Sequence, residues 1–67
     1  MKDKLELVEN SLGYNQHERG YTYILALAEK RISVGPFKTA ESAYADIEML
    51  FHGTHNAQRQ AEIISKF

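Results

Sequence analysis

Two histidines, His52 and His55, have the spacing in this chain that comes closest to a metal site. On one continuous helix, residues three positions apart share a face, as the ligands of many zinc sites do. Gly53 and Thr54 lie between them and are expected to interrupt the helix, and the chain has no cysteine. A histidine at a helix C-terminus also has a simpler role, because its charged form complements the helix dipole. The sequence therefore predicts no metal site and no cofactor.

The remaining groups that could do chemistry show no catalytic pattern. The four serines lie outside any nucleophile-elbow motif, and the glycines are isolated, so no phosphate-binding loop is present. Glu41 and Glu48 are two turns apart on the polar side of an expected helix, which is typical of a solvated face. A chain of 67 residues also has little room for an enclosed pocket. We therefore expect no catalytic residues and no enzymatic activity.

Five residues are candidates for contact with a partner protein. Tyr14 and Arg19 lie in the polar segment GYNQHERG, and both residue types are enriched at the hot spots of protein interfaces. Glu29, Lys30 and Arg31 form the charged tip of an expected hairpin. The sequence predicts that these five residues bind a partner protein. The alternative for Tyr14 is that its ring folds back onto the sheet.

The charge distribution disfavours nucleic acid as a partner. The formal net charge is −1, and the eight lysines and arginines are scattered, with Lys30 and Arg31 the only adjacent pair. Proteins that bind duplex phosphates usually gather Lys and Arg on one face. DNA binding stays the alternative function, and it would depend on Lys30, Arg31 and Lys38.

A β hairpin is the clearest structural unit in the sequence. Residues 21–28 (YTYILALA) and 31–37 (RISVGPF) are rich in Tyr, Ile, Leu and Val and are bounded by turn residues. A two-residue loop at Glu29–Lys30 would place Leu27 opposite Ile32 and Leu25 opposite Val34. A four-residue loop of the same parity is the alternative. One side of this hairpin is small and weakly polar, so it could also pair with a second copy in a homodimer.

Two helices are expected after the hairpin. Thr39 is a good N-cap for the first, which would end at Gly53 in a left-handed conformation. Thr54 would cap the second helix, over residues 55–67. Their apolar stripes follow helical spacing: Ala40, Ala43, Tyr44, Ile47, Leu50 and Phe51 in the first, and Ala57, Ala61, Ile64 and Phe67 in the second.

The first twelve residues fit two descriptions. Asp3 and Glu6 resemble a capping box with Gly13 as a stop, which favours a helix. Leu5 and Leu7 alternate with charged residues, which favours an added strand. We prefer the helix, and we expect GYNQHERG to be a loop.

The chain as a whole is predicted to be one α+β domain over residues 1–67, with an antiparallel hairpin or three-stranded sheet packed against two C-terminal helices. Its composition, 43% hydrophobic and 25% charged, is that of a globular protein. The expected core is Leu25, Leu27, Ile32, Val34, Phe37, Ala43, Ile47, Leu50, Phe51 and Ile64.

Residues 32–49 (ISVGPFKTAESAYADIEM) resemble the strand–turn–helix of the DNA-binding domains of plant ethylene-response factors and of the arm-binding domains of phage integrases. That resemblance implies DNA binding through the sheet. The expected order of elements is strands first, then FKT leading into one helix, a glycine break and a final short helix. This order is also similar to that of small phage-encoded anti-CRISPR proteins. This second resemblance implies a protein that binds and blocks another protein complex.

We therefore expect a small protein-binding module that regulates or inhibits its partner. The lack of cysteine and of an apolar run of about 18 residues predicts a cytoplasmic protein with no membrane segment.

Overall fold

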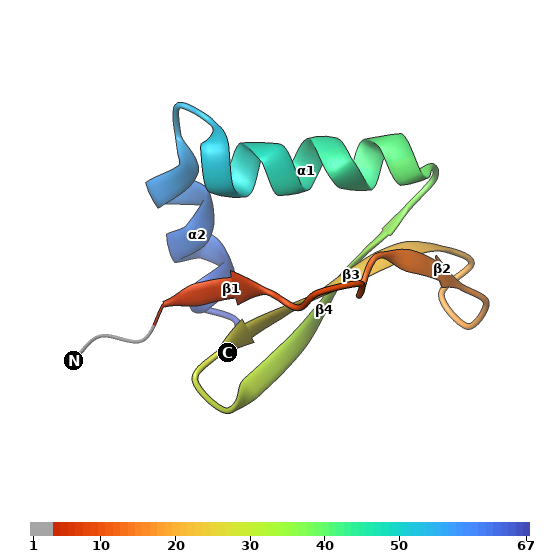
Figure 1. Cartoon of the computed structure of the whole chain (residues 1–67), viewed down its shortest axis with the longest axis horizontal. Helices are drawn as coiled ribbons and strands as arrows, with labels where there is room; N and C mark the ends of the chain where they lie inside the picture. The colour runs from red at the N-terminus through yellow and green to blue at the C-terminus, as the bar shows by residue number, and fades with distance from the viewer. Residues whose placement is uncertain (1–3) are drawn as a thin grey trace.

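The computed structural model describes residues 4–67 and has an α+β fold, in which four antiparallel strands precede two helices (Figure 1). This confirms the fold class expected from the sequence. The strands are β1 (Leu5–Leu7), β2 (Gly13–Asn15), β3 (Gly20–Leu27) and β4 (Lys30–Phe37). The helices are α1 (Ala40–His52) and α2 (Asn56–Ile64).

The sheet is three strands wide, with β3 in the middle. β4 pairs along one edge of β3, while β1 and β2 pair one after the other along its second edge. The expected helix near the N-terminus is therefore wrong for residues 5–7, which form a strand; Asp3 lies outside the described residues. The segment GYNQHERG is also not all loop, because Gly13–Asn15 forms β2.

A serine side chain bridges the break between β1 and β2. The backbone N–H of Val8 donates to the carbonyl of Ile24 at 2.9 Å, which continues the ladder one step beyond β1. The N–H of Ile24 then donates to the Ser11 hydroxyl at 3.0 Å. The Ser11 hydroxyl thus takes the place of a backbone carbonyl as the acceptor for Ile24. Serine side chains can compete with backbone groups in this way, and hydrophobic periodicity does not reveal it.

The β3–β4 hairpin has the expected parity but a different register. Its loop is Ala28–Glu29, so Leu25 lies opposite Ile32 and Leu27 lies opposite Lys30. The loop closes one residue earlier than expected because Ala28 adopts a positive φ of 56°, as tight hairpin turns require. The Arg31 guanidinium donates to the Ala28 carbonyl at 3.1 Å and so holds the turn.

A bulge interrupts the hairpin near its other end. Tyr23 pairs with Val34 but Tyr21 pairs with Phe37, so β4 contains one extra residue there. Gly35 has a φ of +135° and precedes Pro36 through a cis peptide bond. A Cβ on Gly35 would lie 2.6 Å from the carbonyl oxygen of Tyr21. Only glycine fits both the backbone conformation and the close approach.

Helix α1 begins as expected and ends differently. The Thr39 hydroxyl accepts the N–H of Ser42 at 3.1 Å and caps the helix. Gly53 is extended (φ −75°, ψ 165°) rather than left-handed. A Cβ at Gly53 would lie 2.7 Å from the Met49 carbonyl oxygen, so close approach explains the glycine.

The connection to α2 also corrects an expectation. His55 rather than Thr54 occupies the N-cap position of α2, and it makes no side-chain cap. Two amides of α2 instead bond the last turn of α1: Asn56 donates to the Phe51 carbonyl at 3.3 Å, and Gln60 donates to the Leu50 carbonyl at 2.9 Å. These bonds fix the corner between the helices.

The core lies between one face of the sheet and the helices. Its fully buried side chains come from β3, α1 and α2, and further apolar residues pack around them. Ile64 was expected in this core, but it is 38% exposed, whereas Ile63 is 2% exposed. The contacts of Arg59 and Gln60 with α1 fix the rotation of α2, and this rotation places Ile63 in the core. Tyr44 likewise lies outside the core, with 60% of its surface exposed.

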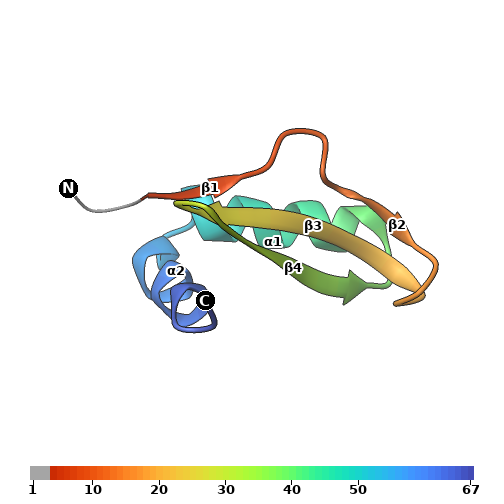
Figure 2. The ribbon, with the colours of Figure 1, turned by 90° about the horizontal axis from the view of Figure 1, so that it is seen from below.

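The helices do not cover the second face of the sheet, although two of its central side chains, Thr22 and Ala26, are at most 9% exposed. In Figure 2 the sheet lies in front of α1, and no element of the described chain crosses in front of β3. Side chains on this face include Thr22, Ile24 and Ala26 of β3 and Ser33 of β4. Neither α1 nor α2 is long and apolar enough to cross a lipid bilayer.

Candidate partner-binding edge of the sheet

The structure divides the five expected partner-binding residues into two groups. Tyr14 lies in β2 and Arg19 in the turn before β3, whereas Glu29, Lys30 and Arg31 lie where β3 turns into β4. The eight residues of β3 separate the groups by about 23 Å, at roughly 3.3 Å per residue. The five residues therefore do not form one continuous surface.

Tyr14 is both exposed, as a partner contact requires, and packed against the sheet, as the alternative predicted. Its side chain is 59% exposed, and its ring meets that of Tyr21 edge to face at a centroid distance of 5.4 Å. Such aromatic pairs restrict the ring without burying it. Tyr14 is thus an ordered aromatic at the far end of the sheet from the hairpin turn.

The three residues of the DNA-binding alternative are also separated. Lys30 and Arg31 begin β4, and Lys38 follows its last residue. The Arg31 guanidinium is already bonded to two backbone carbonyls of the turn, those of Ala28 and Lys30. In the described part of the chain, no cluster of three histidine or acidic side chains could hold a metal ion.

The free edge of β4 presents unpaired backbone groups. Ile24 uses both its N–H and its C=O on the β1 side of β3, with Ser11 and Val8 as partners. In an antiparallel ladder, the residue opposite such a residue also points its own N–H and C=O away from the pair. Ser33 lies opposite Ile24, so its backbone groups point to the free edge of β4. By alternation, Arg31 presents its backbone groups there too.

Within residues 4–67, no strand pairs with this edge. Pro36, which has no N–H, limits the edge at one end, and the charged Lys30–Arg31 pair limits it at the other. Both are common devices that keep an edge strand from pairing indiscriminately. The accessible segment is therefore short, from Arg31 to Gly35.

A groove of about 290 Å³ runs between this edge and α2. Its apolar lining comes from alternate residues of β4 and from Ile63 of α2, and its charged lining comes from Arg59 and Lys66. The residues that line it are Ile32, Ser33, Val34, Gly35, Pro36, Phe37, Arg59, Ile63 and Lys66. Unpaired backbone groups and partly covered apolar side chains thus occur side by side, and we name this region the β4 edge groove.

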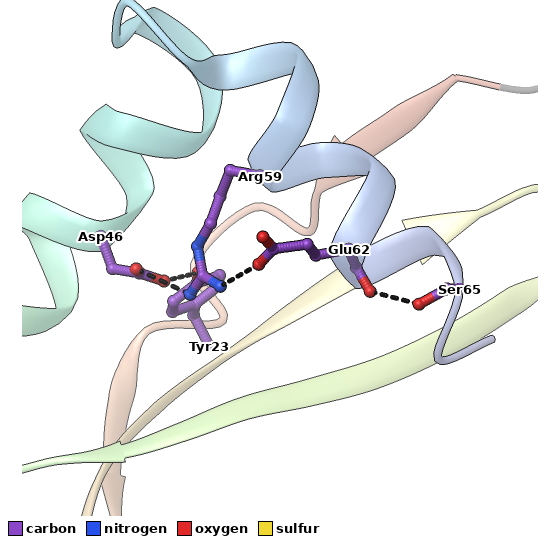
Figure 3. A network of polar contacts seen from close by, with 5 residues as sticks. All are labelled: Tyr23, Asp46, Arg59, Glu62 and Ser65. Atoms are coloured by element: carbon purple, nitrogen blue, oxygen red, sulfur yellow. Dashed lines mark hydrogen bonds and ion pairs between the residues drawn. The ribbon is translucent and has the colours of Figure 1, made fainter.

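A polar network connects α2 to α1 and to β3, the neighbour of β4 in the sheet (Figure 3). The buried Tyr23 hydroxyl donates to the Asp46 carboxylate at 2.5 Å, and the Arg59 guanidinium donates to the same carboxylate at 3.0 Å. Arg59 also lies 3.6 Å from the carboxylate of Glu62. Tyr23 is in β3, Asp46 in α1 and Arg59 in α2, so one carboxylate connects the sheet to both helices.

The network fixes the protonation of Tyr23 and Arg59. Burial, then the hydrogen bond to Asp46, raises the pKa of Tyr23 well above its usual range, so the phenol stays neutral. The hydrogen bond to Asp46 raises the pKa of Arg59, so the guanidinium stays charged. Because Arg59 lines the β4 edge groove, this guanidinium, paired with Asp46 and Glu62, is a permanent feature of the groove.

The surroundings of the groove are basic. Five of the eight lysines and arginines lie in or next to it, and residues 30–38 contain no Asp or Glu. The five are Lys30, Arg31, Lys38, Arg59 and Lys66. Of the five, Arg59 is balanced by Asp46 and Glu62. Although the net charge of the chain is −1, positive charge is therefore in excess around the β4 edge groove.

Sequence reasoning missed the contribution of α2 to this site. Arg59, Ile63 and Lys66 were not among the expected site residues, although they follow the spacing i, i+4, i+7 that places residues on one helix face. That spacing was the available signal. The position of α2 depends on core packing and on the Asp46–Arg59 contact, which joins residues 13 positions apart.

A second hollow, of about 420 Å³, lies at the outer corner of the helices and is lined by residues such as Met49, His55 and Glu62. It contains no free strand edge. A third hollow, of about 440 Å³, lies along β1, whose outer edge is also unpaired within the described residues but whose strand has only three residues. We therefore place the candidate site at the longer strand β4. Comparison of the chain with protein-family models, with curated proteins and with solved structures gives no significant match.

Proposed function

We propose that this protein is a non-enzymatic module that binds another protein through the β4 edge groove and thereby regulates or inhibits it. The observation that carries the proposal is the unpaired edge of β4 next to an apolar groove. An exposed strand edge is a frequent site at which one protein adds to the sheet of another. Backbone hydrogen bonds supply affinity in that mode, and the adjacent groove supplies selectivity.

The size of the molecule supports a steric mechanism of inhibition. Its accessible surface is 5269 Å², and a stable protein interface buries about 800 Å² on each partner. Such an interface would cover roughly a seventh of this surface. The rest would remain as bulk on the partner and could block access to it.

The test is affinity capture from the source cells with and without nuclease, using three tagged baits. Ser33→Pro removes an N–H at the free edge of β4, and proline is tolerated at such edge positions. Ser33→Ala is the matched control, because it keeps the N–H and changes the same side chain. We expect the wild type and Ser33→Ala to capture the same protein after nuclease treatment, and Ser33→Pro to lose it.

Two outcomes would count against the proposal. Equal capture by all three baits would show that the partner binds elsewhere. Loss of every partner after nuclease would favour the DNA-binding alternative, for which the uncovered face of the sheet is the one structural argument. That face has Arg31 as its only cation from β3 or β4, so few phosphate contacts are available there.

A further inference from the structure

We infer that the partner supplies an extended, acidic segment that adds to β4 as an antiparallel fifth strand of the sheet. This inference rests on the proposed function and names the chemistry of the partner. It follows from three features of the β4 edge groove: the direction of its backbone groups, the alternation of its side chains and the sign of its charge.

The backbone groups define where the segment binds and how long it is. Arg31 and Ser33 direct both N–H and C=O to the free edge, because Ser33 lies opposite Ile24 and Ile24 has its partners on the other side. Pro36 has no N–H to offer. A partner segment of about five extended residues would satisfy the open groups between Arg31 and Gly35, at about 3.3 Å per residue.

The side chains define the pattern of the segment. Ile32 and Val34 point to the face that carries α2, and together with Ile63 they form the apolar floor of the groove. Arg31 and Ser33 point to the open face. A strand added beside β4 would therefore place apolar residues opposite Ile32 and Val34, and polar or acidic residues opposite Arg31 and Ser33.

The charge favours an acidic segment over a second copy of this chain. Lys30 precedes the accessible edge, Arg31 begins it and Lys38 lies beyond its end. Lys66 lines the groove from the side of α2. Antiparallel pairing of two β4 edges would bring two such cationic strands together without one carboxylate in residues 30–38. Like charges on adjacent strands destabilise a sheet, and opposite charges stabilise it. The complementary occupant thus carries Asp or Glu.

The probe is a capped hexapeptide, Ac-Glu-Val-Glu-Ile-Glu-Val-NH2, added to the ¹⁵N-labelled full chain. We expect chemical-shift changes confined to β4 and α2, and slower amide hydrogen exchange at Ser33. The matched peptide with lysine at the three acidic positions keeps the apolar residues and reverses the charge. We expect it to bind at least about fivefold more weakly, with the difference reduced at high salt.

Two N-methylated peptides test strand addition itself. In antiparallel pairing, the residues opposite Arg31 and Ser33 direct their N–H groups at β4, and the residues between them direct theirs away. N-methylation of the three glutamates should therefore abolish binding, and N-methylation of the valines and isoleucine should preserve it. The reverse pattern would overturn the antiparallel arrangement. On the protein side, Ser33→Pro should weaken binding of the unmodified peptide about fivefold or more relative to Ser33→Ala.

The outcomes separate this inference from the proposed function. Equal binding of the acidic and basic peptides would overturn the acidic partner. If neither peptide bound, while Ser33→Pro still lost the protein that Ser33→Ala captures from cells, the inference would be wrong and the proposed function would stand. Concentration-dependent dimerisation that Ser33→Pro prevents would identify a second copy as the occupant and overturn both the acidic segment and a separate partner.

Discussion

The Tyr23 hydroxyl donates a 2.5 Å hydrogen bond to the carboxylate of Asp46, which also accepts a 3.0 Å hydrogen bond from Arg59. Tyr23 is fully buried, so its hydroxyl has no access to solvent. The Asp46 side chain is 15% exposed and that of Arg59 is 34% exposed. The network therefore passes from the core to the wall of the β4 edge groove, and it connects α2 to α1 and to β3.

Substitution of Asp46 by alanine should destabilise the fold. It would remove the acceptor of a buried hydroxyl and the partner of Arg59 in one step, and hydrogen bonds to charged groups contribute about 1.5–3 kcal/mol. We expect the free energy of unfolding to fall by about 2–3 kcal/mol, measured by urea denaturation followed by circular dichroism. For a domain of this size, such a loss is a large part of the total stability.

Glu48→Ala is the matched control, because Glu48 is an exposed carboxylate on the same helix. Surface substitutions of this kind usually change stability by less than about 0.5 kcal/mol. If Asp46→Ala and Glu48→Ala shifted the urea midpoint equally, the network would have no special role in stability.

The raised pKa of Tyr23 predicts a loss of stability at alkaline pH. The folded protein holds the phenol proton more tightly than the unfolded chain, whose tyrosine pKa is about 10. The stabilisation from this group is therefore fully present below about pH 10 and is lost as the pH rises further, toward the folded pKa. Urea midpoints measured from pH 8 to pH 11 should fall more steeply for the wild type than for Tyr23→Phe. Parallel curves would contradict this prediction.

The helical part of the fold could be predicted because its signals are local. Thr39 caps α1 through a bond to Ser42 three residues away, and the spacing of Ala43, Ile47 and Leu50 gives one apolar stripe. The parity of the hairpin was also predictable, because a slip of one residue would place charged residues in the core. Its loop was not, since Ala28 adopts a positive φ that alanine seldom adopts.

The edge strands and the groove depend on distant contacts that no local pattern encodes. Leu5 and Leu7 form a strand because Leu27 and Leu25 lie opposite them, although the same residues also fit a capped helix. Ser11 completes the ladder from 13 positions away. The β4 edge groove likewise requires α2 to fold back toward β4, and α2 is held there by core packing and by the contact of Arg59 with Asp46.

The bulge in β4 gives a third prediction. Gly35→Ala should destabilise the protein, because the new Cβ would lie 2.6 Å from the Tyr21 carbonyl oxygen and 3.0 Å from a methyl group of Thr22, at a φ of +135°. Strained backbone conformations and overpacking each cost about 1–3 kcal/mol. We expect a loss of at least about 2 kcal/mol in the free energy of unfolding, measured by urea denaturation.

Gly13→Ala provides the comparison for this substitution. A Cβ at Gly13 would meet nothing within 4 Å, although Gly13 is also a strand glycine. We expect it to be neutral or slightly stabilising, because alanine restricts the unfolded chain. A Gly35→Ala protein as stable as Gly13→Ala would contradict the close approach of β4 to Tyr21.

The last prediction compares two neighbouring isoleucines of α2, one under the groove and one outside the core. Ile63 is 2% exposed, packs in the core and lines the β4 edge groove, whereas Ile64 is 38% exposed. Ile63→Ala should cost about 2–5 kcal/mol, as large-to-small substitutions in a core do. Ile64→Ala should cost less than about 1 kcal/mol. Thermal denaturation of both variants measures the difference, and the reverse order would mean that α2 presents its other face to the sheet, which would remove Ile63 from the groove.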